Sequence, residues 1–274
     1  MRTPTRRPRG RLKDDGASCA LIVRADDFGM CRSVNKAIAD CLTRRKVSCA
    51  GLIAPARFFD EAARLCRLHP GWDIGVHLTL FGEWTNDPWK PLAPLRRIPS
   101  LLNKAGFFHT LPRYLWRQKP PKRQVEREYE AQIRRVFRAG LRPSYLDFHI
   151  ATLDEYRKLA LRLAARYRLL VSGSLGENEV HADFRRSFRL NRSFDAARSL
   201  QLFRPGLNIT VAHPGYDTAE LRRYTIPGQK PGQTARLRQR SFDDLDARIF
   251  DHLEKKLGIP LIGYGDLRRT TPHG

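Results

Sequence analysis

The chain has few cysteines, and none of them is placed to form a disulfide framework or a zinc site. The 274 residues contain five, all in the first quarter of the chain: Cys19, Cys31, Cys41, Cys49 and Cys66. Their number is odd and no CxxC pair is present, so neither a disulfide-stapled fold nor a structural zinc knuckle is indicated. We expect reduced cysteines, which fits a cytoplasmic protein.

Long apolar runs are also absent. No stretch approaches the roughly 20 apolar residues that a helix needs to span a bilayer. The first residues, Met1 to Lys13, are rich in arginine and proline and lack the apolar centre of a secretory signal. The sequence therefore predicts no membrane span, a disordered basic leader over residues 1–17, and a single domain over residues 18–274.

Acidic residues are scarce compared with basic ones, at 28 against 51, which gives a net charge of +23. Such an excess is typical of chains that bind nucleic acids or anionic membranes. The arginines are, however, spread along the whole chain, and several stand beside acids on expected helices, as in residues 126–130 and 243–248. We therefore predict a solvated basic surface without a specific nucleic-acid partner.

Short apolar runs alternate with amphipathic helical stretches, which is typical of βα units and a parallel sheet. Strands are expected near residues 19–24, 50–54, 73–80, 144–149, 169–173, 207–212 and 260–264. Helices are expected near residues 32–45, 58–66, 122–139, 154–167 and 242–257. The pattern predicts an α/β fold, a TIM-barrel-like (β/α) barrel of about seven parallel strands.

Three segments do not follow this alternation. Residues 81–119 are rich in proline, tryptophan and phenylalanine and are too long for an ordinary connection. They form either an aromatic platform for a sugar or a loop that only packs over the end of the barrel. Residues 174–207 have no clear assignment, and residues 225–240 are predicted to be a loop rich in glycine, proline, glutamine and arginine.

The most informative motif is the stretch from Ala25 to Gly29, which contains two adjacent aspartates and directly follows an apolar run. Two carboxylates at the exit of a buried strand are costly unless a metal or a proton transfer uses them. His77, His149 and His213 stand at the ends of three later apolar runs. In a barrel of parallel strands, all these side chains are expected to gather at one rim.

An aspartate and two histidines from separate strand ends make a three-ligand site with open positions, typical of a catalytic metal. Such a metal lowers the pKa of bound water towards roughly 7 and polarises a carbonyl oxygen. Of Asp26 and Asp27, one can ligate while its neighbour takes the proton of that water, and His213 could protonate a leaving nitrogen. The pattern indicates metal-assisted hydrolysis of an amide or ester. Imidazole ligands favour Zn²⁺ or a similar first-row ion.

Asp147 lies two residues before His149, so both side chains are expected to point to the same side of the strand. It could support a ligand or contact the substrate, or it could have a structural role.

Four motifs resemble those of the YdjC-type carbohydrate deacetylases, the family that contains the chitooligosaccharide deacetylases and a hopanoid-biosynthesis-associated branch. They are Ala-Asp-Asp-Phe-Gly, Gly-x-His-Leu-Thr-Leu, Asp-x-His and His-Pro-Gly-Tyr, in matching order over about residues 19–267. The resemblance implies an irregular (β/α) barrel that removes acetyl groups from N-acetylated sugars with one divalent metal, commonly assigned Mg²⁺. It implies Asp27, His77 and His149 as metal ligands, Asp26 as the base, and His213 as the histidine of the His-Pro-Gly motif.

Two departures from the family pattern stand close to these motifs. Arg24 occupies the place of the asparagine that usually precedes Ala-Asp-Asp, and Ala151 and Leu153 occupy the places of the next two histidines after His149. Because the first histidine is the expected ligand, metal binding should survive, while the substrate contacts and the rate of reaction are open.

The expected partner is an N-acetylated sugar, oligosaccharide or glycolipid, and the sequence is compatible with a homo-oligomer. Two alternatives remain open. One is a catalytically weakened barrel that binds polyanions through its basic surface. The other is a metal-dependent hydrolase of a different bond, such as a phosphate ester.

Overall fold

The computed structural model describes residues 19–110, 113–150, 152–180 and 203–270. The predicted leader at residues 1–17 and the substituted position Ala151 lie outside the described residues. In the described part, no helix is both long and apolar enough to cross a membrane. All five cysteines are described, and none of them forms a disulfide within the described residues.

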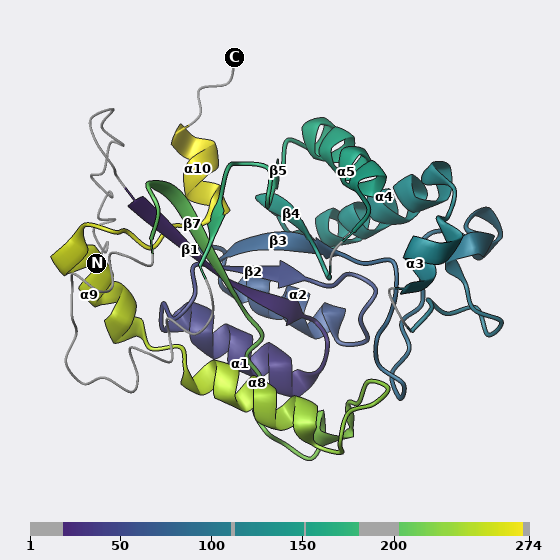
Figure 1. Cartoon of the computed structure of the whole chain (residues 1–274), viewed down its shortest axis with the longest axis horizontal. Helices are drawn as coiled ribbons and strands as arrows, with labels where there is room; N and C mark the ends of the chain where they lie inside the picture. Colours follow the sequence, from purple (N-terminus) through teal and green to yellow (C-terminus); the bar gives the residue numbers. More distant parts are fainter. Residues whose placement is uncertain (1–18, 111–112, 151, 181–202, 271–274) are drawn as a thin grey trace.

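Seven parallel strands form one curled sheet in the order β5-β4-β3-β2-β1-β7-β6 (Figure 1). They are β1 (Cys19–Phe28), β2 (Cys49–Leu52), β3 (Asp73–Leu78), β4 (Tyr145–Phe148), β5 (Leu170–Val171), β6 (Asn178–Glu179) and β7 (Gly206–Ala212). The predicted α/β fold with about seven parallel strands is confirmed. The predicted barrel is confirmed only in part, because β5 and β6, two residues long each, do not pair with one another, and the described sheet is an open half-barrel.

The central strand β1 owes its position to its sequence. Leu21, Ile22 and Val23 are at most 1% exposed, and all residues of the strand after Cys19 are buried. An apolar run buried on both faces is typical of a parallel sheet covered by helices. Each of these side chains contributes about 1.5–3 kcal/mol by leaving water.

Helices connect and cover the strands. They are α1 (Arg32–Thr43), α2 (Phe59–Leu68), α3 (Arg113–Gln118), α4 (Lys122–Arg138), α5 (Asp154–Tyr167), α8 (Gln233–Asp243), α9 (Ala247–Leu257) and α10 (Tyr264–Thr270), with short 3-10 helices at Leu95–Arg97, Pro99–Leu101 and Leu221–Arg223. In Figure 1, α4 and α5 lie together on one side of the sheet, and α1 and α8 on the other.

The C-terminal third differs most from the prediction. The expected loop at residues 225–240 contains most of α8, which begins after Gly232 in the left-handed conformation (φ +69°). The single helix predicted at 242–257 is interrupted before α9, where the side chain of Asp246 caps the new helix by accepting from the backbone N–H of Arg248. The strand predicted at 260–264 is reduced to one bridge between Leu261 and Leu21, and α10 follows.

Helix α4 anchors the long connection that follows β3. The buried carboxylate of Glu128 accepts hydrogen bonds from the backbone N–H groups of Leu92 and Ala93, at 3.0 and 2.8 Å. The amide of Gln132 pairs with both backbone groups of Thr79. Burial raises the pKa of Glu128 to about 7 although these donors oppose the shift. Hydrogen bonds to α4 therefore hold the connection at its start, at Thr79, and in its middle, at Leu92 and Ala93.

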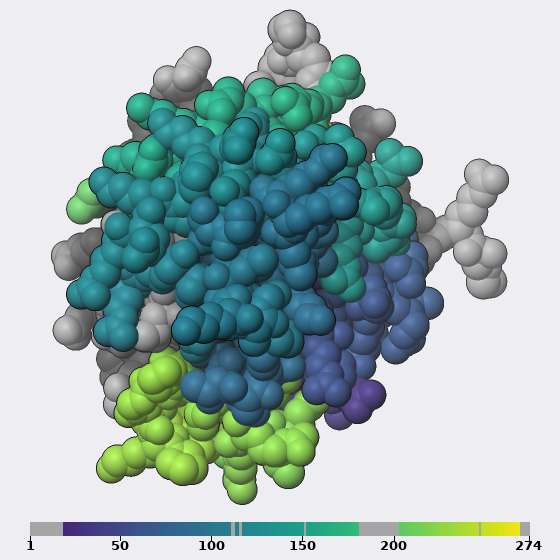
Figure 2. Space-filling view, turned by 90° about the vertical axis from the view of Figure 1, so that its right-hand side faces the viewer, coloured from purple at the N-terminus to yellow at the C-terminus, as the bar shows by residue number. Residues whose placement is uncertain are grey.

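The parallel strands all present their carboxyl ends to the same edge, where open α/β sheets bind ligands. Asp26 and Asp27 stand at the end of β1, His77 is the last but one residue of β3, and His149 and His213 directly follow β4 and β7. Figure 2 faces this edge: the segment between β3 and α4, in blue to teal, covers its middle, and the segment through α8, in yellow-green, lies below it.

Candidate metal centre

A bulge at the end of β1 turns two adjacent aspartates into the same site. The register with β2 shifts between Ala25 and Phe28, and Asp27 has a φ of +74°, a conformation that residues other than glycine rarely adopt. Without this irregularity, neighbouring side chains of a strand would point to opposite faces. Such strain, about 1–3 kcal/mol per residue, is typical of functional sites.

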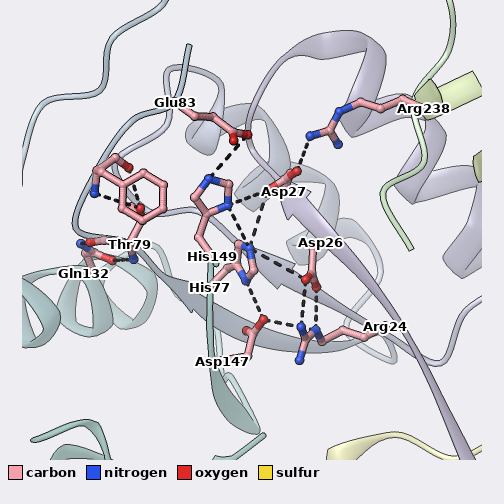
Figure 3. A network of polar contacts seen from close by, with 11 residues as sticks. Arg24, Asp26, Asp27, His77, Thr79, Glu83, Gln132, Asp147, His149 and Arg238 are labelled. Atoms are coloured by element: carbon pink, nitrogen blue, oxygen red, sulfur yellow. Dashed lines mark hydrogen bonds and ion pairs between the residues drawn. The ribbon is translucent and has the colours of Figure 1, made fainter. Parts of the chain in front are cut away.

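Asp27, His77 and His149 come together at the core of the site (Figure 3). The Oδ1 atom of Asp27 lies 3.1 Å from Nδ1 of His149 and 3.6 Å from Nε2 of His77. The two imidazole nitrogens are 3.3 Å apart. All three residues are buried, and no hydrogen bond of good geometry satisfies Oδ1 of Asp27.

Asp147 fixes the orientation of His77. The two residues stand opposite one another on β4 and β3, and Oδ2 of Asp147 lies 2.5 Å from Nδ1 of His77. This contact leaves Nε2 of His77 directed towards Asp27, the arrangement in which a carboxylate orients a metal-binding histidine. Burial alone would lower the pKa of His77, but the carboxylates of Asp147 and Asp26 raise it to about 10. Of the roles left open for Asp147, its contact with His77 favours the one in which Asp147 orients a proposed metal ligand.

Arg24 neutralises Asp26, the other aspartate of the pair. Its Nε and Nη2 atoms lie 2.6 and 2.8 Å from the two carboxylate oxygens of Asp26, and Nε lies 3.2 Å from Oδ2 of Asp147. Its Nη1 atom donates to the hydroxyl of Ser172 at 2.9 Å. Burial would raise the pKa of Asp26, but Arg24 and His77 together lower it. Asp26 is therefore an ionised carboxylate held in one orientation, with Oδ2 3.9 Å from Nε2 of His77.

A second buried arginine, Arg238 of α8, pairs through Nη2 with Oδ2 of Asp27 (Figure 3). Burial would raise the pKa of Asp27, but Arg238 and the nearby imidazoles of His149 and His77 hold it well below its usual range. Sequence reasoning missed this residue because residues 225–240 were predicted to be a loop. Thr234, Ala235 and Arg238 are buried at helical spacing, and that spacing is the signal that could have revealed it.

The connection after β3 borders the site as well as packing over the sheet. The rings of Phe81 and Trp89 each lie 5.4 Å from the imidazole of His149, and Oε1 of Glu83 lies 3.7 Å from its Nε2. Burial raises the pKa of Glu83. Trp84 and Trp89 are themselves buried in the core. The segment therefore packs over the end of the sheet, and two of its core rings, Phe81 and Trp89, also lie against His149. The aromatic platform for a sugar stays a prediction.

His213 stands apart from the buried group. It is exposed, and its backbone N–H donates to the hydroxyl of Ser241 at 3.1 Å. Within the described residues, no ion pair of 4.0 Å or less joins its side chain to Asp26 or Asp27. Partial desolvation lowers the pKa of His213, while Asp27 and Asp26 act in the opposite direction. The structure thus brings four of the five predicted residues into one buried group and leaves His213 exposed, close enough for its charge to interact with Asp27 and Asp26.

Among the residues that the structure describes, two sets of side chains could hold an ion: Asp27 with His77 and His149, and Asp26 with His77 and Asp147. Arg24 already pairs with both carboxylates of the second set, whereas Oδ1 of Asp27 is buried and unsatisfied. One carboxylate oxygen and two imidazole nitrogens are donors that first-row divalent ions accept. The residues of the first set therefore fit a divalent metal.

Comparison with known proteins points to one family. The model of the YdjC-like protein family matches residues 20–247. A carbohydrate deacetylase from Enterococcus faecalis is 34% identical over 153 residues, which cover 54% of this chain and 56% of the relative. A chitooligosaccharide deacetylase from Proteus mirabilis is 32% identical over 135 residues, 47% of this chain and 48% of the relative. The alignments thus span about half the length of these curated relatives.

A solved structure shares the fold. It is the crystal structure of an Enterococcus faecalis protein named a cellobiose-phosphate cleavage protein, with a TM-score of 0.72 and 23% sequence identity. The superposition covers 92% of this chain and 99% of that chain. At this level of identity, the likeness shows the arrangement of strands and helices alone.

Proposed function

Because the chain belongs to the YdjC-like family, we propose that it is a metal-dependent hydrolase that removes acetyl groups from N-acetylated sugars or glycoconjugates. The names of its curated relatives support this substrate class. The observation that carries the proposal is the buried group of Asp27, His77 and His149 at the carboxyl edge of the sheet, with Asp26 beside it. Family membership also confirms the resemblance that the sequence motifs indicate.

Asp27, His77 and His149 are the proposed holders of one divalent ion. When bound, this ion supplies a Lewis acid that polarises the acetyl carbonyl and acidifies water. The imidazole donors suit Zn²⁺ or a similar ion, and Mg²⁺ is the ion that the family resemblance implies. Asp147 keeps Nε2 of His77 turned inward, and Arg238 holds the second oxygen of Asp27.

Asp26 is the proposed general base. It is ionised, and a carboxylate oxygen has a second lone pair that the bond to Arg24 does not occupy. When water adds to the acetyl carbon, Asp26 takes the proton of that water. When the C–N bond breaks, the leaving nitrogen takes a proton from His213, which in its protonated form is a ready donor because its pKa is lowered.

We further propose that residues 18–274 form one domain and that the protein acts in the cytoplasm. The absence of a disulfide among its cysteines is consistent with this location.

Asp26→Asn is expected to reduce acetate release by about 10²–10⁴-fold, because the variant keeps the shape of the side chain and loses the proton acceptor. The measurement is acetate release from a panel of N-acetylglucosamine oligosaccharides and glycolipids, with phosphate release recorded in parallel from sugar phosphates. Asp60→Asn, at an exposed aspartate of α2, is the matched control and should keep the wild-type rate. Equal rates for Asp26→Asn and wild type would contradict the assignment of the base.

The same panel decides between the proposed function and its alternatives. Release of phosphate without acetate would show that the protein hydrolyses a phosphate ester and not an N-acetyl group. Release of neither product, together with nucleic-acid binding that falls steeply with salt, would favour a polyanion-binding protein.

Metal affinity is expected to rise with pH by up to about tenfold per unit between pH 6.5 and 8.5. The reason is that His77, with a pKa of about 10, carries a proton that a metal must displace from Nε2. Calorimetric titration with Zn²⁺ in buffers of different ionisation enthalpy would show the release of about one proton per ion bound. Asp147→Asn should flatten this dependence, and an affinity that does not change with pH would contradict it.

A further inference from the structure

Arg238 carries a hydrogen-bond donor that nothing in the described part of the chain satisfies. The residue is 6% exposed, Nη2 is bound to Asp27, and Nη1 is buried without a partner. A buried donor without an acceptor costs about 1–3 kcal/mol, and more when the group is charged. The guanidinium remains protonated under all ordinary conditions, so this donor is permanently available.

The fold places this side chain through close packing. The backbone N–H of Gly215 donates to the carbonyl of Arg238 at 3.1 Å. A Cβ atom at Gly215 would lie 3.0 Å from Cβ of Arg238 and 2.9 Å from Cδ2 of Leu221. A larger residue would thus push α8 away. The glycine of the His-Pro-Gly motif is therefore one of the residues that let Arg238 reach Asp27.

The guanidinium is restrained on a second side by an aromatic ring. Its central carbon lies 5.7 Å from the centre of the Trp84 ring, within the range of a cation–π contact. Asp27 and Glu83 raise the pKa of Arg238, although burial alone would lower it. A rigid, planar fork held by Trp84 and Asp27 leaves Nη1 little freedom to turn towards solvent.

The position of the Arg238 guanidinium indicates which kind of ligand group its unpaired Nη1 would contact. Nη2 holds Oδ2 of Asp27, and Oδ1 of the same carboxylate faces His77 and His149. Because the two Nη atoms belong to one planar group, Nη1 stays near the carboxylate of Asp27, beside which the proposed reaction occurs. The ligand that satisfies it must bring an oxygen acceptor, and a negatively charged one gains most.

On the proposed deacetylase function, we propose that Arg238 is a catalytic residue whose Nη1 donates a hydrogen bond to the acetyl carbonyl oxygen. This oxygen gains negative charge as water adds to the acetyl carbon, and it loses the charge when the carbonyl re-forms and the C–N bond breaks. Arg238 gives up no proton in either step. Its contribution is a preorganised positive donor that is worth more in the transition state than in the bound substrate.

The first test separates the role of Nη2, which binds Asp27, from the proposed role of Nη1. Arg238→Lys keeps a positive charge for Asp27 but has no planar fork, and Arg236→Lys, at an exposed residue of the same helix, is the matched control. We expect Arg238→Lys to lower kcat by about 10²–10³-fold with KM and Zn²⁺ affinity within about threefold of wild type. Wild-type kcat in Arg238→Lys, or a loss of kcat that equals its loss of metal affinity, would overturn the proposal.

Chemical rescue and product binding supply independent readouts. Guanidinium chloride at millimolar concentration should restore part of the kcat of Arg238→Ala and have no such effect on Asp26→Asn. Acetate, the product of the proposed reaction, should bind Zn²⁺-loaded Arg238→Lys at least about tenfold more weakly than wild type. If wild type deacetylates no sugar, the proposed function fails. Acetate affinity still decides on Arg238, because unchanged binding would overturn its role as a donor to an acyl oxygen.

Discussion

Replacing His77 with alanine should lower the affinity for Zn²⁺ by more than about 100-fold, beyond the 10–100-fold loss typical of residues that only orient a ligand. The variant removes Nε2, which lies 3.6 Å from Oδ1 of Asp27 and 3.3 Å from Nδ1 of His149. It also leaves Asp147 without its histidine partner. We expect acetate release to fall with metal occupancy.

The affinity is measured by calorimetric titration of metal-free protein. His69→Ala, at an exposed histidine beyond α2, is the control and should bind Zn²⁺ like wild type. Asp147→Asn should fall between the two, with a loss of 10–100-fold, because it orients the ligand without providing one. Wild-type affinity in His77→Ala would remove His77 from the metal centre.

Arg24→Met should destabilise the metal-free protein by about 3–5 kcal/mol, the usual effect of removing one partner from a buried ion pair. Arg24 is buried, as are Asp26 and Asp147, and it pairs with both carboxylates. Methionine has a similar apolar stem but would leave the buried carboxylates of Asp26 and Asp147 with only His77, among the described residues, as an ion-pair partner. The measurement is the free energy of unfolding from urea denaturation.

This destabilisation should depend on pH in a defined direction. The pKa of Asp26 is lowered in the folded protein, so the pair stabilises the fold above the unfolded value of about 3.9, and this stabilisation is lost as the pH falls through the lower folded pKa. The difference between wild type and Arg24→Met should therefore narrow in acid. Arg32→Met, at an arginine of α1 whose side chain is 72% exposed, is the control. Its free energy of unfolding should stay within about 0.5 kcal/mol of wild type at pH 7 and in acid. An Arg24→Met variant as stable as wild type at pH 7 would contradict the account of this pair.

The convergence of the proposed metal-site residues could be predicted from sequence because it depends on a simple rule. Parallel strands end at one edge, so polar residues that directly end apolar runs, as Asp26, Asp27, His77 and His149 do, must meet there. The bulge that turns both aspartates into the site could not be predicted, since it depends on the register between β1 and β2.

The partners of these residues depend on contacts between distant segments. Arg24 was noticed only as a departure from a motif. Its ion pair with Asp147 joins β1 to β4, two strands that β2 and β3 separate in the sheet. Arg238 was missed because α8 is polar in sequence, and one of its few buried residues is the arginine itself. The predicted barrel is confirmed only in part for a related reason: the apolar run near residues 169–173 contributes a strand of only two residues at the edge of the described sheet.

The proposed function requires that one divalent ion at Asp27, His77 and His149 enables acetate release. The decisive measurement is a titration of chelator-treated protein with Zn²⁺ and, separately, with Mg²⁺, in which bound metal and the rate of acetate release from N-acetylglucosamine oligosaccharides are followed together. The account predicts no release without metal and a rate that rises with the ion and reaches its plateau at one ion per chain. Full release from metal-free protein, or one ion bound with no release from any N-acetylated substrate, would contradict it.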